Sequence, residues 1–272
     1  MPLVKSDFRR GVLTLTLADV DNRNALSVQL VGELLEAMDA AEADPQVRVI
    51  VMTNEGPVFC AGADLRQKSS PEAATDPAPD AAPDAAQGAA PPRRAGASEL
   101  FARFRNSPKP WVGRLAGHCV AGGMGLAAAM DISVAADDIK FGFTEVRLGV
   151  SPAMISVICL PRMREADARS AFLRGNRFGA AEAARLGLIN TALPRDQLDA
   201  EVAQVVDDLL RGGPGAIAAT KQVLGRVPQM SYDDAAAWTA ELSAGLFRSD
   251  EAREGMAAYL GKRDPAWVPG KD

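Results

Sequence analysis

The stretch Gly117-His-Cys-Val-Ala-Gly-Gly-Met-Gly125 lies inside a longer segment, Trp111–Pro152, around which we expect the fold to be organised. The apolar run Trp111–Leu115 before it predicts a strand, and Leu126–Met130 after it predicts a buried helix. Backbone amides at a turn that opens a helix lack partners within the helix and lie at its positive end. Such a turn is suited to hold an oxygen that gains negative charge, although the glycine spacing alone fits a tightly packed strand–helix corner equally well.

A lone carboxylate follows about twenty residues later, in Phe141-Gly-Phe-Thr-Glu145-Val-Arg-Leu-Gly149. Phe141, Phe143, Val146 and Leu148 around it are apolar, so we expect the carboxylate of Glu145 to be partly desolvated. Desolvation disfavours the charged form and raises the affinity for protons, which suits a group that both takes and gives one. Glu145 is therefore our candidate for proton transfer. The alternative is an exposed glutamate at the edge of a short strand.

Composition excludes several classes of protein. The 272 residues are 47% hydrophobic and 24% charged, as in ordinary globular proteins, and a net charge of -5 argues against nucleic acid or anionic membrane as the partner. Cys60, Cys119 and Cys159 are far apart in the sequence, which favours reduced thiols. The N-terminus shows no apolar leader and no later run is long enough for a bilayer, so we expect a cytoplasmic protein.

The first two thirds of the chain alternate strands and helices, which indicates an α/β fold. Ser27 is the expected N-cap of a helix that runs to about Ala43. Strands are predicted at Gly11–Leu17, Val47–Met52, Ile132–Ala135 and Leu188–Leu193, and further helices at Ser98–Phe104, Glu165–Leu173 and Ala180–Leu186. From Asp196 onward only helical patterns remain, at about 196–211, 214–226, 231–247 and 249–261. We therefore expect a core of residues 1–195 and a helical C-terminal region of residues 196–272 that serves oligomerisation.

Residues 67–97 interrupt this pattern with a segment rich in Ala, Pro and Asp and without periodicity. Such a composition cannot build a core. A surface insertion is the simpler interpretation, and a lid over a ligand is the functional alternative.

The sequence lacks the residues that several kinds of catalytic or binding site require. His118 is the only histidine, which argues against a multi-histidine metal site and makes a structural role its simplest interpretation. Gly123-Met124 stands where a phosphate loop requires Lys and Ser or Thr, and neither a dinucleotide fingerprint nor a nucleophile elbow is present. Backbone amides and carboxylates remain, with no metal expected. They suit chemistry next to a thioester carbonyl, where amides hold an enolate oxygen and a carboxylate moves a proton.

Motifs spread over nearly the whole chain outside the 67–97 insertion resemble those of the crotonase (enoyl-CoA hydratase/isomerase) superfamily. The resemblance rests on Asn22–Leu26, Phe59–Leu65, Gly117–Gly125, Met130–Ile132, Phe141–Glu145, Arg174–Phe178, Ala180–Leu188 and Glu254–Arg263. Each motif alone would be weak, but their common order is a strong signal. The resemblance implies a spiral of ββα repeats and a helical C-terminal region that builds homotrimers, often paired into hexamers.

The resemblance also implies the site. The backbone N–H groups of Ala63 and Gly122 would form an oxyanion hole for the thioester of an acyl-CoA substrate. Coenzyme A is then part of the substrate, and no separate cofactor is expected. The residues implied to contact coenzyme A are Arg23, Ala25, Ala61, Asp64 and Leu65, together with Tyr259 and Lys262 of the last helix, which commonly approach from a neighbouring subunit.

One departure from the family pattern concerns the reaction. Hydratases of the family usually carry two glutamates, of which Glu145 matches the second, whereas Gly125 occupies the first position. Thr144–Ser156 resembles a bacterial branch of enoyl-CoA or methylglutaconyl-CoA hydratases in which glycine at that position occurs. Our interpretation is a 2-enoyl-CoA hydratase, a lyase of fatty acid metabolism. The alternatives are a single-glutamate 3-enoyl-CoA to 2-enoyl-CoA isomerase and a non-catalytic acyl-CoA-binding protein.

Overall fold

The computed structural model describes residues 1–68 and 96–270, except for the side chains of Lys68 and Ala97. The insertion expected at 67–97, and the choice between a surface segment and a lid, lie outside the described residues apart from its edges. Within the described part, two sheets carry the core, one of six strands and one of four.

The larger sheet is parallel except for its first strand, which runs antiparallel to the second. Its order is β1 (Val4–Arg9), β2 (Val12–Leu17), β3 (Val49–Asn54), β5 (Trp111–Leu115), β7 (Ile132–Ala136) and β10 (Thr191–Leu193). In the smaller sheet only the last pair is antiparallel. Its order is β4 (Val58–Cys60), β6 (His118–Val120), β8 (Lys140–Gly142) and β9 (Phe178–Gly179).

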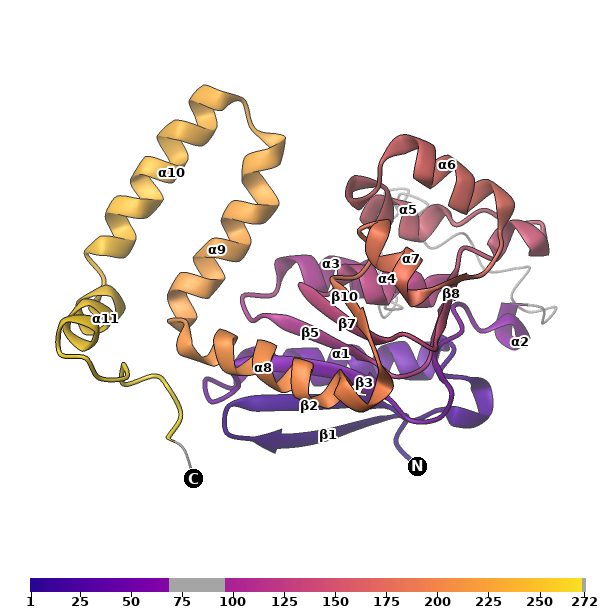
Figure 1. Cartoon of the computed structure of the whole chain (residues 1–272), viewed down its shortest axis with the longest axis horizontal. Coiled ribbons are helices and arrows are strands. Elements are labelled where there is room, and N and C mark those ends of the chain that lie inside the picture. The colour runs from indigo at the N-terminus through magenta and orange to yellow at the C-terminus, as the bar shows by residue number, and fades with distance from the viewer. Residues whose placement is uncertain (69–95, 271–272) are drawn as a thin grey trace, which may run out of the picture.

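Successive strand pairs explain the two sheets. β3 and β4, β5 and β6, and β7 and β8 each place their first strand in the larger sheet and their second in the smaller one. A helix or 3₁₀ turn follows each pair, so the chain advances as a spiral of ββα units (Figure 1). This arrangement confirms the expected mixed α/β fold.

Most helices agree with the pattern read from the sequence, but the one at Ala153–Cys159 was not predicted and the one after the glycine turn begins at Gly122 rather than at Leu126. The helices are α1 (Val28–Ala43), α2 (Leu65–Lys68), α3 (Ala97–Asn106), α4 (Gly122–Ala129), α5 (Ala153–Cys159), α6 (Glu165–Arg174), α7 (Ala180–Arg185), α8 (Leu198–Arg211), α9 (Pro214–Arg226), α10 (Tyr232–Phe247) and α11 (Asp250–Leu260). The Ser27 hydroxyl accepts a hydrogen bond from the Leu30 N–H at 3.1 Å and confirms the predicted cap of α1.

The four short strands of the smaller sheet were not predicted, and three strands of the larger sheet differ from expectation. β1 was not predicted because it lies at the edge of the sheet and buries only Val4, so its sequence shows no apolar alternation. Arg10 and Gly11, both at positive φ (50° and 82°), form the two-residue turn into β2. β3 begins two residues later than predicted, and β10 begins at Thr191 rather than at residue 188.

Helix α8 covers the larger sheet, where it lies against β3, β5 and β7. Leu198, Val202, Val206 and Leu210, spaced at i, i+4, are buried in the same apolar core as the strands. The all-helical pattern thus begins at α8, but the chain leaves the core only after this helix. The division into residues 1–195 and 196–272 remains a prediction.

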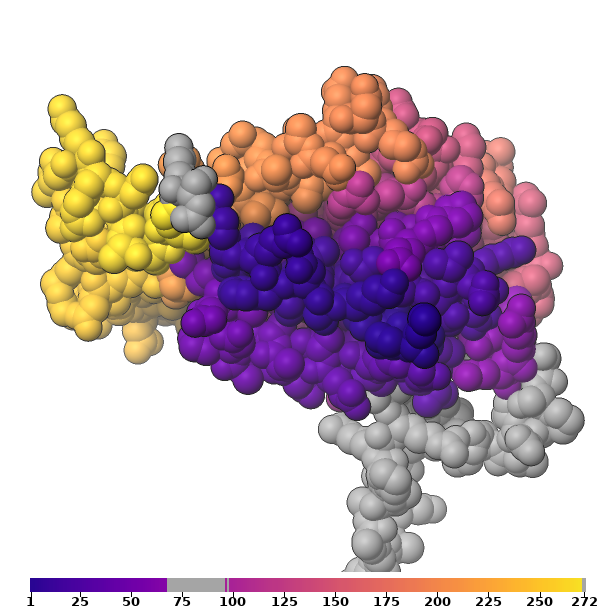
Figure 2. Space-filling view, turned by 90° about the horizontal axis from the view of Figure 1, so that it is seen from below, coloured from indigo at the N-terminus to yellow at the C-terminus, as the bar shows by residue number. Residues whose placement is uncertain are grey.

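Helices α9 to α11 and the segment that follows them, residues 214–270, form what we call the arm. α9 and α10 run side by side away from the sheets, and α11 lies beyond them (Figure 1). Figure 2 shows the arm as a lobe at one end of the molecule. α10 contains 16 residues and none of them is buried, so within one chain its apolar residues are only partly covered.

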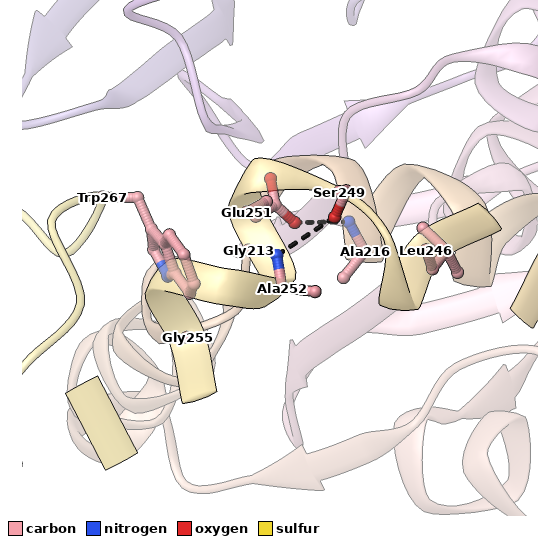
Figure 3. A pocket seen from close by; sticks show the side chains of 8 residues that line it. All are labelled: Gly213, Ala216, Leu246, Ser249, Glu251, Ala252, Gly255 and Trp267. Atoms are coloured by element: carbon pink, nitrogen blue, oxygen red, sulfur yellow. Dashed lines mark hydrogen bonds between the residues drawn. The ribbon is translucent and has the colours of Figure 1, made fainter. Parts of the chain in front are cut away.

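Hydrogen bonds stabilise the base of the arm, where it joins the core; some lie within the arm, and one links it to Arg48 of the core. Glu251 of α11 accepts hydrogen bonds from the N–H groups of Gly215 (2.9 Å) and Ala216 (2.8 Å) at the start of α9, the second of which is drawn in Figure 3. Arg48 donates to the carbonyls of Gly212 and Trp267, both at 2.8 Å. The cavity of about 130 Å³ in Figure 3 lies at this junction.

Candidate active site

The glycine turn of the central stretch opens α4. Ala121, the residue before the helix, has φ 49° and ψ -126°, a conformation unusual for a residue with a side chain, and its N–H donates to Gly142 O at 2.9 Å. Gly122 is the first helical residue, and the first N–H groups of a helix have no partner within it. The turn therefore presents the Gly122 N–H at the positive end of α4.

A second loop lies directly against this turn. A Cβ added to Gly62 would meet Ala121 Cβ at 2.7 Å and Gly122 N at 2.8 Å, so only glycine, at φ 89°, allows this approach. Leu26 N–H donates to Gly62 O at 2.7 Å, and Leu26 is in parallel register with Ala63. Because that bond uses the carbonyl before Ala63, the Ala63 N–H is directed to the opposite side of the chain. Ala63 is also exposed, as an oxyanion donor must be.

The predicted coenzyme A segments meet at the same place. Ala61 N–H donates to Arg23 O at 3.2 Å, which joins the two loops, and Arg23 is exposed at φ 55°. Leu65, 56% exposed, opens α2 on the same loop. Asp64 is buried instead, and its carboxylate accepts from Asn22 Nδ2 (3.1 Å) and Arg66 N (2.9 Å). Asp64 thus fixes the loop, and Ala25, also buried, contributes backbone only.

Glu145 begins a 3₁₀ turn, Glu145–Leu148, three residues after Gly142, the carbonyl partner of Ala121. Its Oε2 atom is buried and has no hydrogen-bond partner in the described part of the chain. Desolvation by burial raises the pKa of its carboxyl above the ordinary 4.5. An unpartnered buried carboxylate oxygen is costly in a folded protein and is typical of a group that binds a ligand or a proton.

The expected source of this desolvation needs correction. Phe143 is buried, as predicted, but Val146 is 36% exposed and Leu148 is 58% exposed. Both project outward because a 3₁₀ turn, unlike a strand, distributes successive side chains around its axis. Cys159, the last residue of α5, is close enough to the carboxylate of Glu145 to interact with it electrostatically. Burial raises the pKa of the Cys159 thiol to about 12, and the charge of Glu145 acts in the same direction.

The first glutamate position of the family is closed. An ideal Cβ at Gly125 would lie 2.5 Å from Ile155 Cγ2 and 2.7 Å from Phe101 Cζ. Ile155 comes from α5 and Phe101 from α3, and both are buried. Sequence reasoning identified Gly125 as a vacancy but missed the two side chains that fill it. No local signal points to them, because three separate helices converge here.

Two other polar residues of the central stretch have structural roles. His118 Nδ1 accepts a hydrogen bond from the Lys140 N–H at 3.0 Å, between two strands of the smaller sheet. Asp131 accepts from the Trp111 N–H at 2.8 Å and pairs with Lys221 of α9 at 2.5 Å. Asp131 thus links the arm to the start of β5.

Tyr259 and Lys262 lie at the far end of the arm. Tyr259 is 84% exposed, and the helix that carries it is at the opposite end of the molecule from α5 and α6 (Figure 1). Within one chain the structure does not bring these two residues together with the other predicted site residues.

Comparison with known proteins gives a consistent picture. Residues 7–270 match the family "Enoyl-CoA hydratase/isomerase", and the chain belongs to this family. An enoyl-CoA hydratase structure from Mycobacterium avium is 38% identical, covers 98% of this chain and 99% of its own, and superposes with a TM-score of 0.70. A Thermus thermophilus relative, also named for enoyl-CoA hydratase, is 34% identical over 254 residues, 93% of this chain and 96% of the relative. Carnitinyl-CoA dehydratase of Escherichia coli is 31% identical over 94% of this chain and 95% of its own length.

The family assignment identifies the chain as an enzyme of the enoyl-CoA hydratase/isomerase type, consistent with a lyase. Helices long and apolar enough to cross a membrane are not found among the described residues.

Proposed function

We propose that the protein adds water across the double bond of a 2-enoyl-CoA thioester. The thioester oxygen would accept hydrogen bonds from the N–H groups of Ala63 and Gly122, and Glu145 would take a proton from water as its hydroxyl group bonds to the β-carbon. The same proton then passes from Glu145 to the α-carbon as the enolate collapses. The observation that best supports this proposal is the buried Oε2 atom of Glu145, which has no hydrogen-bond partner among the described residues. Glu145 lies three residues after Gly142, whose carbonyl accepts the hydrogen bond from the Ala121 N–H.

The backbone donors supply much of the stabilisation in this scheme. Amides fixed at a helix start need no reorganisation when charge develops, and removal of one such donor typically costs about 3 kcal/mol of transition-state stabilisation. Glu145 supplies the proton transfer, which typically contributes 10²–10⁴-fold. Burial raises its pKa above the ordinary 4.5, which makes it a stronger proton acceptor than an exposed carboxylate.

A second candidate reaction is the conversion of a 3-enoyl-CoA to a 2-enoyl-CoA, and the closed position at Gly125 favours it. Glu145 would remove a proton from C2 to form a dienolate and return it to C4, so that the double bond moves by one carbon. One carboxylate is sufficient for this transfer, whereas a water molecule held between two carboxylates has no counterpart beside Gly125.

Two absorbance measurements test these reactions. With crotonyl-CoA, hydration removes the conjugated enoyl absorbance; with a 3-enoyl-CoA, isomerisation creates it. We expect turnover of crotonyl-CoA. A protein that binds acyl-CoA tightly but changes neither absorbance would contradict both reactions and favour a binding role.

We also propose that the chain assembles into a homotrimer, or a hexamer of two trimers. Large apolar residues are exposed in two regions at opposite ends of the molecule (Figure 1). One set is on the arm and consists of Phe247, Met256, Tyr259 and Leu260; the other surrounds α5 and α6 and consists of Leu148, Val150, Met154, Val157, Leu160 and Leu173. A head-to-tail contact between two different surfaces forms a ring when the rotation from one copy to the next closes, as the proposed trimer requires. Such a ring would bring Tyr259 and Lys262 of one copy towards the coenzyme A loops of the next.

The three cysteines support the expected cytoplasmic location. Cys60, Cys119 and Cys159 are buried and unpaired, and free thiols are typical of a reducing compartment.

A further inference from the structure

Two apolar side chains, Phe101 and Ile155, pack on Gly125 and form what we call the wall. Gly125 is buried in the middle of α4, and the position of its absent Cβ lies within 2.9 Å of two atoms of Phe101 and within 2.5 Å of Ile155. Real Cβ atoms do not approach carbon so closely, so any larger residue at 125 requires both neighbours to move. Phe101 and Ile155 therefore occupy the space beside Gly125 and leave no room for a longer side chain at this position.

This wall lies close to Glu145. Ile155 and Cys159 are four residues apart on α5 and so share one face of the helix, about 6 Å apart. Cys159 is the residue of α5 that interacts electrostatically with the Glu145 carboxylate, and Ile155 is the one that contacts Gly125. The same helix face thus borders the carboxylate at one end and closes position 125 at the other.

We propose that Phe101 and Ile155 restrict the site to a single carboxylate and thereby set the ratio of water addition to proton relocation. The inference rests on the proposed function, because it concerns how one site divides between the two reactions. A water molecule beside Glu145 has hydrocarbon, and no second acceptor, on the side of Phe101 and Ile155. Isomerisation moves a proton from C2 to C4 and needs only the one carboxylate. The wall therefore slows hydration relative to isomerisation.

Trimmed variants with and without a new carboxylate test the inference. Phe101→Ala/Ile155→Ala is compared with Phe101→Ala/Ile155→Ala/Gly125→Glu, and Gly125→Glu alone is the control with the wall intact. The rates on crotonyl-CoA and on 3-hexenoyl-CoA are measured on the same preparations. We expect the hydration-to-isomerisation ratio to rise at least tenfold from the double to the triple variant, since a positioned acid–base group contributes 10²–10⁴-fold. Gly125→Glu alone should lose both activities.

A second measurement does not depend on turnover. Gly125→Ala should lower the unfolding temperature of the wild type, and it should lower that of the Phe101→Ala/Ile155→Ala variant much less. Gly32→Ala is the matched control, because a Cβ at Gly32 meets nothing within 4 Å. If Gly125→Ala is as stable as Gly32→Ala, position 125 is not closed and the inference is wrong.

The outcomes separate the inference from the proposed function. A triple variant that unfolds like the double variant, yet keeps the ratio within twofold, overturns the inference and leaves the proposed function intact. A wild-type protein inactive on both thioesters overturns the proposed function, and the inference about the ratio falls with it.

Discussion

The helices α4 and α10 differ in how far their own chain buries them. α4 has eight residues, six of them buried, and it is held on all sides by strands and helices of its own chain. α10 has twice that length and no buried residue. The helix whose first N–H would hold the thioester oxygen is thus packed within one chain, whereas the arm leaves apolar side chains exposed. We infer that the chemistry belongs to the single chain and that the arm serves assembly.

The largest effect is expected at the start of α4. Gly122→Pro should lower kcat by 10² to 10³ relative to Gly122→Ala, because proline removes the N–H that would hold the enolate oxygen. Proline is tolerated at the first position of a helix, so α4 should persist. Gly122→Ala is the matched control, since its Cβ meets the same neighbours, Gly62 Cα and Leu26 Cδ1, at 3.1 Å. Steady-state rates within threefold of each other for the two folded variants would exclude Gly122 as a donor.

Glu145→Gln tests the other half of the site. The change keeps the size of the side chain and removes the base, so we expect kcat to fall by about two orders of magnitude or more, with acyl-CoA affinity nearly unchanged. In the wild type, kcat/KM should fall on acidification as Glu145 becomes protonated. Burial raises the pKa of this carboxyl, so the fall should be centred above pH 4.5. Glu165→Gln, at an exposed ion pair on α6, is the control. If Glu145→Gln keeps more than a tenth of wild-type turnover, the assignment of the base is wrong.

The arm's dependence on a second copy is tested by Phe247→Asp. Phe247 is 69% exposed on α10, and a carboxylate buried there in an interface without a partner is costly. Light scattering should show the assembly shifted towards the 28.6 kDa chain, with association weakened at least tenfold. Val28→Asp, equally exposed at 69% but on α1, should leave the mass unchanged. A wild-type protein that is a monomer at micromolar concentration would contradict the trimer directly.

The packing of α11 against the start of α9, at the base of the arm, should show a smaller effect. Glu251→Ala removes the carboxylate that accepts from Gly215 and Ala216 at the start of α9, a loss that typically costs about 1 kcal/mol. We expect the unfolding temperature to drop by about 2–4 °C. Glu241→Ala, on the exposed face of α10, is the control. Equal unfolding temperatures for the two variants would show that the hydrogen bonds from the start of α9 to Glu251 do not stabilise the protein.

The sequence predicted the parts of the fold that repeat locally. The helices from residue 196 onward were predicted to within about two residues, because each has a regular apolar face and clear breaks. The Gly122 turn and Glu145 were found because glycine runs and isolated carboxylates are visible in the sequence. The wall of Phe101 and Ile155 was not, because it depends on three helices meeting from distant segments. β1 was missed because a solvent-exposed edge strand needs no apolar pattern.

The smallest expected effect concerns the stability cost that the site imposes on the core. The pKa of Glu145 is higher in the folded than in the unfolded chain, so its ionised form is less favourable after folding. The cost is absent below the unfolded pKa and appears as the pH rises through the folded one. Glu145→Gln should therefore raise the unfolding temperature at pH 7, by an amount on the order of a few degrees at most.

The pH dependence distinguishes this cost from a general gain in packing. The advantage of Glu145→Gln should shrink as the pH falls below about 4, where the wild-type carboxyl is protonated in both states. Glu165→Gln, whose parent side chain is 81% exposed, should show no such gain at pH 7. Calorimetry of the three proteins at pH 4 and pH 7 measures the difference. An equal increase in unfolding temperature at both pH values would mean that the increase comes from packing, and it would contradict a desolvated charge at Glu145. An increase confined to pH 7 would show that the ionised carboxylate destabilises the fold at the position where the proposed chemistry needs it.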